Sequence, residues 1–288
     1  MKKIPIYTKL LVVFPLFFLM AIVIDGGTNF DFSEVIAYVV LIITVFSFGL
    51  YIVFSMENRR DRINTIKITL RDQDARLFNL YQFSQYFDPA VTIAVRNQID
   101  QYLIAQIDWK LEDIGKSSKN LSYIFGMVRG IKAVGAEQEM IKEKMLDNLQ
   151  EISILLKESA FQVKNKMSGY EWGSLLFLFG IILFALFYEN VGSPIAALVI
   201  AIIASTLALS LFILSEYDSL QWQEQKWIWE PLVELFQDLD LVPYFPGVLF
   251  WENRVNIKKI DGLKKARIAK YKHPYPNVHD KEVEEVCL

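Results

Sequence analysis

Four apolar stretches dominate the hydropathy pattern, at residues 10–24, 35–56, 172–187 and 195–214, and none contains Asp, Glu, Lys, Arg or His. Crossing about 30 Å of hydrocarbon takes about 20 helical residues. The second and fourth stretches have 22 and 20 residues and are long enough alone. The first and third are shorter, but uncharged neighbours extend them and one short loop joins each to a full-length stretch. We expect membrane spans at residues 9–28, 35–56, 172–188 and 195–214.

Two loops, at residues 25–34 and 188–194, define the expected topology. They carry four acidic residues and none of the 30 Lys and Arg residues of the chain. Basic residues accumulate on the cytoplasmic side of membrane helices. We therefore predict two transmembrane hairpins in the cell (inner) membrane, with both termini in the cytoplasm.

The first stretch has a second interpretation, because Lys2, Lys3 and Lys9 precede it as in a secretory signal. A signal needs small residues at its cleavage site. Ile22 and Ile24 stand near the end of the stretch instead. We favour an uncleaved first helix.

The predicted fold class is all-α, with four parts. Residues 1–56 form the first hairpin, 57–171 a cytoplasmic helical domain, 172–214 the second hairpin and 215–288 a cytoplasmic tail. Gly and Pro are sparse in the helical domain, and Asp88 and Pro89 suit the cap and first turn of a helix. We expect its helices at about residues 57–87, 89–114, 117–132 and 136–167, the first continuing the second span and the last leading straight into the third span.

Two of these helices carry apolar faces at spacings of three and four. On the first, the face is Ile63, Ile66, Leu70, Leu77 and Tyr81; on the last, it is Met145, Leu149, Ile152, Leu156, Ala160, Val163 and Met167. Because both helices continue membrane spans, we expect the faces to pack on each other as a bundle core. A coiled coil that binds a partner is the alternative.

The tail combines aromatic and basic segments. Trp222, Trp227 and Trp229 suit a membrane interface, and an amphipathic helix begins at Pro231. Residues 256–271 predict a hairpin that turns at Asp261-Gly262, and residues 280–285 are expected to be disordered. The candidate contacts to anionic lipid headgroups are the basic residues Arg254, Lys258, Lys259, Lys264, Lys265, Arg267, Lys270 and Lys272. A soluble, strongly charged hairpin is the alternative.

Candidate chemistry is sparse. His273 and His279 lie in a Pro-containing tail, whereas zinc needs ligands that converge from several positions, and Cys287 is the single cysteine. No catalytic or phosphate-binding motif appears, so we expect no enzyme, no cofactor and no metal. Asp108, Glu112 and Asp113 are interpreted as a solvated acidic face rather than a cation site. Residues 57–171 are nearly neutral, with 17 basic and 16 acidic residues, so no nucleic-acid partner is expected.

A polar stripe on the second span offers a candidate pore lining. Its members, Thr44, Ser47, Tyr51 and Ser55, recur at spacings of three and four. They could line a water-filled path between subunits, or their hydroxyls could bond to helix carbonyls or a neighbouring helix. Spans without ionisable residues disfavour a proton- or sodium-coupled transporter.

The layout resembles that of bestrophins, and more closely the bacterial bestrophin-like membrane proteins of unknown function, over about residues 35–240. Residues 102–109 (YLIAQIDW) are similar to a helix of that group with an acidic residue and a Trp. The resemblance implies an all-helical oligomer that passes anions through a pore lined by the second span. The chain lacks a match to the acidic calcium clasp and the aromatic pore neck of the animal proteins, so calcium gating is not carried over.

Together these patterns predict an oligomeric, channel-like membrane protein that passes small anions. Its expected partners are the lipid bilayer, through anionic headgroups, and further copies of itself. The alternative is a non-conducting membrane-anchored scaffold or sensor that docks a cytoplasmic protein.

The topology can be tested with single cysteines in a Cys287→Ser background. Cysteines at Gly27 and Gly192 should react with impermeant thiol reagents from outside the cell, because both lie in the loops that lack basic residues. A cysteine at Ser118 should be protected. Labelling of Ser118 from outside would contradict the layout.

Overall fold

The computed structural model describes residues 6–23, 34–188, 193–252, 255–256, 260 and 262–287. The chain is mostly helical with a small three-stranded sheet. It divides into two compact units. We call residues 4–63 and 166–222 the apolar unit, and residues 1–3, 64–165 and 223–288 the mixed unit. Helix α2 (Glu34–Ser84) contributes to both units without a break.

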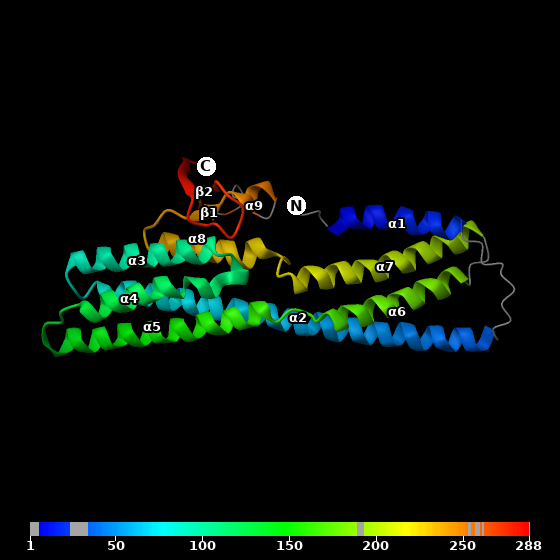
Figure 1. Ribbon diagram of the computed structural model, residues 1–288, viewed down its shortest axis with the longest axis horizontal. Coiled ribbons are helices and arrows are strands. Elements are labelled where there is room, and N and C mark those ends of the chain that lie inside the picture. Colours follow the sequence, from blue (N-terminus) through cyan, green and yellow to red (C-terminus); the bar gives the residue numbers. More distant parts are fainter. Residues whose placement is uncertain are drawn as a thin grey trace. The chain divides into compact units, whose positions relative to one another are not determined.

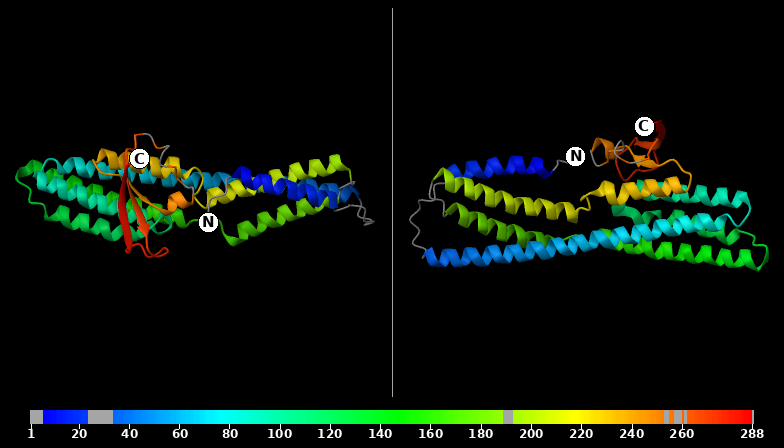
Figure 2. Two further views of the ribbon diagram at one scale, coloured as in Figure 1. Left: turned by 90° about the horizontal axis from the view of Figure 1, so that it is seen from above. Right: turned by 180° about the vertical axis from the view of Figure 1, so that it is seen from behind.

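The apolar unit holds α1 (Ile6–Val23), the first part of α2, α6 (Gly169–Tyr188) and α7 (Pro194–Asp218). Figures 1 and 2 show α1 running beside α7. Three helical stretches are long and apolar enough to cross a membrane: the part of α2 from Tyr38, the stretch that ends with α6, and α7. In α1, Leu11–Val23 is a shorter apolar helix. The structure therefore supports three of the four predicted spans by length.

Small residues let the helices of the apolar unit approach one another. Phe17 and Ala21 of α1 pack against Ala197, Ala201 and Ala204 of α7. Such small side chains favour close helix packing in a membrane. A second cluster joins α2 to α6 and α7 through Phe48, Ile52, Leu175, Ile182 and Leu211.

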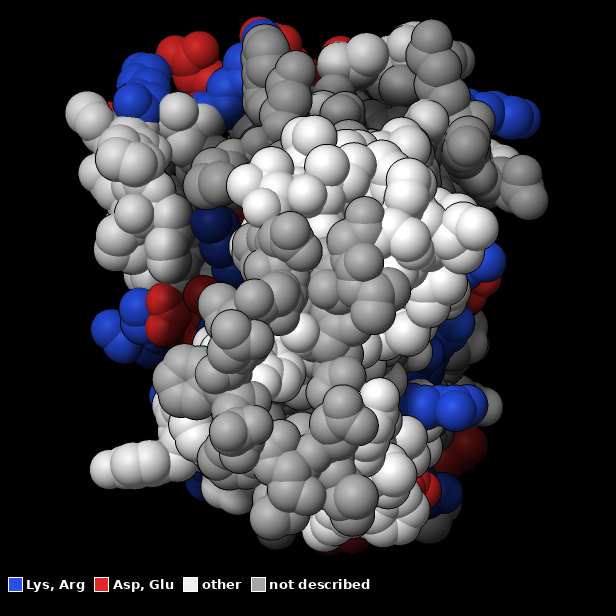
Figure 3. Space-filling model, turned by 90° about the vertical axis from the view of Figure 1, so that its right-hand side faces the viewer, with Lys and Arg blue, Asp and Glu red and all other residues white. Residues whose placement is uncertain are grey.

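The outer surface of the apolar unit is itself apolar. Ile42, Phe46, Phe177, Phe184 and Ile195 are each more than half exposed. Figure 3 looks onto the loop end of this unit, where the nearest described atoms are uncharged. Exposed apolar surface of this extent suits contact with lipid or with another subunit.

The mixed unit contains the rest of α2 and a series of shorter elements. The helices are α3 (Pro89–Asp108), the 3-10 helix η1 (Leu111–Ser117), α4 (Ser118–Gly130), α5 (Gly135–Lys164), the π-helix η2 (Gln225–Trp229), α8 (Glu230–Asp238) and α9 (Val248–Trp251), and the strands are β1 (Tyr244–Pro246), β2 (Lys265–Tyr271) and β3 (Lys281–Cys287).

The predicted apolar faces of α2 and α5 share one core. Of the predicted face of α2, Leu77 lies in the same buried cluster as Met145, Leu149 and Ile152 of α5, and Tyr81 packs against that cluster. The expected bundle packing is therefore confirmed for this part of the chain.

The predicted helix boundaries are right at one end of α3 and wrong at the other. The Asp88 side chain accepts a hydrogen bond from the Ala90 amide at 2.8 Å, as a capping residue does. The helix ends at Asp108 rather than Ile114, because Lys110 adopts a φ of 55° that an α-helix cannot accommodate. A 3-10 helix follows.

The helix predicted at residues 136–167 also ends early. Helix α5 stops at Lys164, and residues 165–168 separate it from α6. It therefore does not lead straight into the third span.

The small sheet corrects the all-α prediction. Strand β1 pairs in parallel with β2, with Tyr244 opposite Arg267, and β3 pairs antiparallel with β2, with Tyr271 opposite Lys281. The predicted hairpin at residues 256–271 is not seen among the described residues: 256, 260 and 262–264 are not in a strand, and β2 pairs with β1 and β3 instead. Residues 257–259 and 261 lie outside the described residues. The expected disorder of residues 280–285 is wrong.

Charge complementarity explains why the acidic end forms a strand. Lys270 of β2 pairs with Glu284 of β3 at 2.7 Å, and Lys272 pairs with Glu282 at 3.2 Å. Opposite charges on paired strands stabilise the sheet. The Asp261-Gly262 turn signal concerns only its neighbours in the sequence. The pairing of β2 with β3 joins two strands that this turn does not connect.

Candidate functional site

Two of the four residues of the polar stripe on α2 are buried in the apolar unit, and two are partly exposed. Thr44 and Ser55 are buried, and the Thr44 hydroxyl donates to the Val40 carbonyl at 2.7 Å. Ser47 and Tyr51 are half-buried, and Tyr51 packs against the cluster around Phe48. Ser47 and Tyr51 are therefore the two members with surface left for a pore or a neighbouring subunit.

The basic cluster of the tail is partly neutralised within the chain. Arg267 donates to both carboxylate oxygens of Asp100 at 2.8 and 2.6 Å, and Lys270 and Lys272 pair with acids of β3. Lys264 and Lys265 are exposed. The remaining candidates, Arg254, Lys258 and Lys259, lie outside the described residues.

A buried ionic cluster closes one end of the apolar unit, and sequence patterns did not reveal it. The Asp218 carboxylate lies 3.6 Å from the guanidinium groups of both Arg59 and Arg62, and Arg62 also donates to the Asp218 carbonyl at 2.9 Å. The same carboxylate accepts the Met167 amide at 2.8 Å. It thus holds the short link between α5 and α6, and Ser168 and Glu171 exchange side-chain-to-backbone hydrogen bonds where α6 begins.

A second buried carboxylate organises the mixed unit. Asp108, at the end of α3, is 7% exposed, and one of its oxygens accepts hydrogen bonds from the hydroxyls of Tyr244 and Tyr271, both at 2.6 Å. Its other oxygen pairs with the Lys281 ammonium, which also donates to the Tyr244 hydroxyl at 3.0 Å. Burial first, and the Asp108 charge second, raise the pKa of both tyrosines well above the ordinary value.

This arrangement corrects the interpretation of the acidic segment as a uniformly solvated face. Glu112 is exposed and Asp113 is half-buried, but Asp108 is buried among its partners. Those partners come from three strands more than 130 residues away in the sequence. No local pattern could have identified them.

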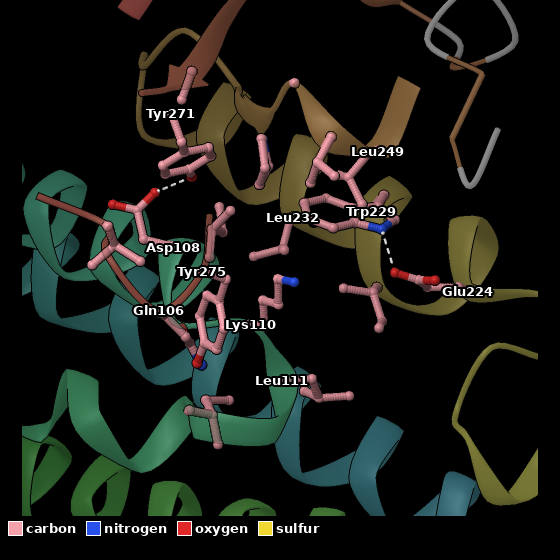
Figure 4. A pocket seen from close by; sticks show the side chains of 18 of the residues that line it. Gln106, Asp108, Lys110, Leu111, Glu224, Trp229, Leu232, Leu249, Tyr271 and Tyr275 are labelled. Carbon is pink, nitrogen blue, oxygen red and sulfur yellow. Dashed lines mark hydrogen bonds between the residues drawn. The ribbon is translucent and has the colours of Figure 1, made fainter. Parts of the chain in front are cut away.

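A cavity of about 580 Å³ lies next to Asp108. Figure 4 shows Trp229, Leu232 and Leu249 on one side and Gln106, Tyr271 and Tyr275 on the other, with Lys110 and Leu111 between them. The indole of Trp229 donates to Glu224 at 3.1 Å. Trp227 also lines the space and is buried. The structure thus encloses Trp227 and Trp229 in the protein, where the sequence predicted a membrane interface.

The cavity also contains an acidic group from α2. Asp74 lines it together with Leu70 and Arg71 of the same helix. Burial raises the pKa of the Asp74 carboxyl to about 8, against a smaller opposing effect of Arg71. Among the described residues, no hydrogen bond reaches this carboxyl. No pattern in the sequence marks Asp74, because a single Asp on a charged helix is ordinary.

The Asp108 cluster predicts a difference between two lysines of the sheet. Lys281→Met should lower the free energy of unfolding by about 3 kcal/mol, because it leaves the buried carboxylate unpaired. Lys270→Met is the matched control and should cost less than about 1 kcal/mol, because the Lys270–Glu284 pair is exposed. Denaturant unfolding of the purified protein measures both.

Adding Asp108→Asn to Lys281→Met should recover part of the lost stability, since the double variant no longer buries an unpaired charge. Equal effects of Lys281→Met and Lys270→Met would contradict the assigned role of Asp108.

Comparison with known proteins identifies the family. A family model described as the Bestrophin-like domain matches residues 9–219, well over half of the chain. No curated protein and no solved structure matches. The match confirms the resemblance drawn from the sequence, and the family suggests a channel-like membrane protein rather than an enzyme. The chain belongs to the bestrophin-like family.

Proposed function

We propose that the chain assembles into a homo-oligomer that passes small anions across the membrane. The observation that carries this proposal is the filled interior of the apolar unit. Phe48, Leu175, Ile182 and Leu214 are each at most 1% exposed and pack on one another. Ions need a polar or wettable path, so a path must form between copies of the chain.

Ser47 and Tyr51 are the residues we assign to that path. Both keep exposed surface on α2, and their hydroxyls can donate hydrogen bonds to an anion. Thr44 and Ser55 belong to the same stripe but are buried, so we assign them to the wall behind it. The apolar stretch of α2 carries no acidic residue that would repel an anion.

The proposed topology has four spans in two hairpins, with the mixed unit and both termini in the cytoplasm. It rests on the two loops without basic residues. The first span would need α1 to extend through residues 24–28, which lie outside the described residues. The domain boundaries at residues 56, 171 and 214 follow from the same layout.

Contact with anionic headgroups is proposed chiefly for Lys264 and Lys265. These two side chains are exposed, whereas three of the other candidates pair with acids of the chain. Each exposed lysine near an anionic surface contributes about 1 kcal/mol.

A membrane-anchored sensor is the second candidate function. The observation that favours it is the cavity of about 580 Å³ in the mixed unit. Clefts and cavities of several hundred Å³ with a few polar groups are typical of small-molecule sites. A sensor could also dock a cytoplasmic protein, as the sequence analysis expected.

The channel proposal predicts the effect of one substitution in α2. Ser47→Leu should reduce anion flux several-fold, because a bulky apolar side chain would narrow the path and exclude water from it. Flux into liposomes that contain the purified protein measures this, and size-exclusion chromatography with light scattering checks that the oligomer persists.

Ser210→Leu in α7 is the matched control. Ser210 is also half-buried, and its hydroxyl donates to the Thr206 carbonyl of its own helix at 3.1 Å. This variant should conduct like the wild type. A stable monomer, or liposomes as tight as protein-free vesicles across pH, calcium and voltage, would contradict the channel and favour the sensor.

A further inference from the structure

We propose that the cavity of the mixed unit binds an organic amine, with Asp74 as the charged contact and the aromatic walls around its apolar body. This inference does not depend on whether the protein conducts ions. It assigns a ligand class to a cavity that lies wholly within one compact unit.

The walls suit a flat or aromatic apolar group. Trp229 from η2 and Tyr271 and Tyr275 from the tail supply aromatic surface, and Leu232 is among the apolar lining residues (Figure 4). Trp227 of η2 also lines the cavity. Aromatic faces attract both apolar bodies and cationic nitrogens. A volume of about 580 Å³ is within the usual range for small-molecule sites.

Most charged groups around the cavity are already paired within the chain. Asp108 pairs with Lys281, Arg71 with Glu234, Lys270 with Glu284, Lys272 with Glu282, and His273 lies 3.3 Å from Asp280. Glu224 accepts the Trp229 indole hydrogen. Two charged side chains of the lining remain, Asp74 and Lys110.

These two groups differ in their surroundings. Lys110 is exposed, and its ammonium lies 4.6 Å from the centre of the Tyr275 ring, so water and the ring both compensate its charge. Asp74 is half-buried, and no hydrogen-bond donor among the described residues reaches its carboxyl. The positive charge of Arg71 lowers the pKa of Asp74, but the Arg71 guanidinium lies 3.2 Å from the Glu234 carboxylate. Asp74, Arg71 and Glu234 together therefore carry one negative charge when Asp74 is ionised.

A half-buried carboxyl in the cavity wall, without a donor among the described residues, therefore selects for a positive charge. Its pKa of about 8 means that it is largely protonated at pH 7 in the empty cavity. An ammonium group favours the carboxylate form, so binding should release a proton. Affinity for an amine should rise with pH and level off above about pH 8, because the folded protein then no longer has to lose that proton.

Other titratable groups near Asp74 do not produce the same pattern. Burial raises the pKa of Tyr102 well above its ordinary value, so its hydroxyl stays protonated through this pH range. His273 lines the cavity as well, but its side chain is more than half exposed beside Asp280. Proton release from Asp74 is thus the expected signal between pH 7 and pH 8.

Three probes with one indole body test the proposal: tryptamine, tryptophol and indole-3-propionate. The full chain in lipid nanodiscs should bind tryptamine about tenfold more tightly than tryptophol, because a charged hydrogen bond replaces a neutral one. Indole-3-propionate should bind most weakly. Saturation-transfer NMR and calorimetry measure the affinities.

Asp74→Asn should lower the tryptamine affinity about tenfold and leave tryptophol unchanged, since only the charge is lost. Asp72→Asn is the matched control, because Asp72 is exposed on the same helix and does not line the cavity. It should bind like the wild type.

Calorimetry of the unmutated protein at pH 7, in two buffers of different ionisation enthalpy, gives a readout that needs no variant. Tryptamine should release close to one proton per molecule bound, and tryptophol none. The proposal is overturned if no probe binds, if tryptophol binds as tightly as tryptamine, or if no proton is released. Because no flux is measured, these outcomes do not bear on the channel.

Discussion

The cost of placing a polar group in hydrocarbon is the constraint on which the apolar unit depends. A backbone in the bilayer must satisfy its own hydrogen bonds, so it crosses as a helix. Helices α6 and α7 and the first part of α2 are long and apolar enough to meet this requirement. Small residues of α7 make the contact with α1, and large apolar side chains such as Phe48 and Ile182 fill the interior beside α2. Other large apolar side chains face outward. A unit built in this way is well suited to lipid and to its own copies.

Outside the apolar stretches, two buried carboxylates, Asp218 and Asp108, hold neighbouring segments together. Asp218 draws together Arg59, Arg62 and the Met167 amide in the link between α5 and α6. Asp108 does the same for three strands of the mixed unit. Both carboxylates are fully engaged by donors within the chain, which makes them structural. Asp74 differs from them because none of the described residues donates to it, and this difference is the reason to assign it a ligand.

Periodic patterns predicted the parts of the fold that depend on local sequence. The apolar faces of α2 and α5, the Asp88 cap and the amphipathic helix α8 all follow from spacing and capping within one segment. The sheet could not be predicted in this way, because β2 pairs with an acidic strand through charges that a local turn signal does not report.

The same limit applies to the candidate sites. The stripe on α2 is visible in the sequence, but only packing separates buried Thr44 from half-exposed Ser47. The cavity is lined by residues of α2, α3, η2, α8 and the sheet region, so no single stretch of sequence predicts it. The positive φ of Lys110, which ends α3 beside the cavity, has no signal in its residue type.

The most direct test of the channel account is a structure of the assembled protein in lipid nanodiscs. The account predicts several copies around a central axis, with Ser47 and Tyr51 of α2 facing that axis. A monomer, or an oligomer in which this face of α2 is buried against another helix, would contradict it.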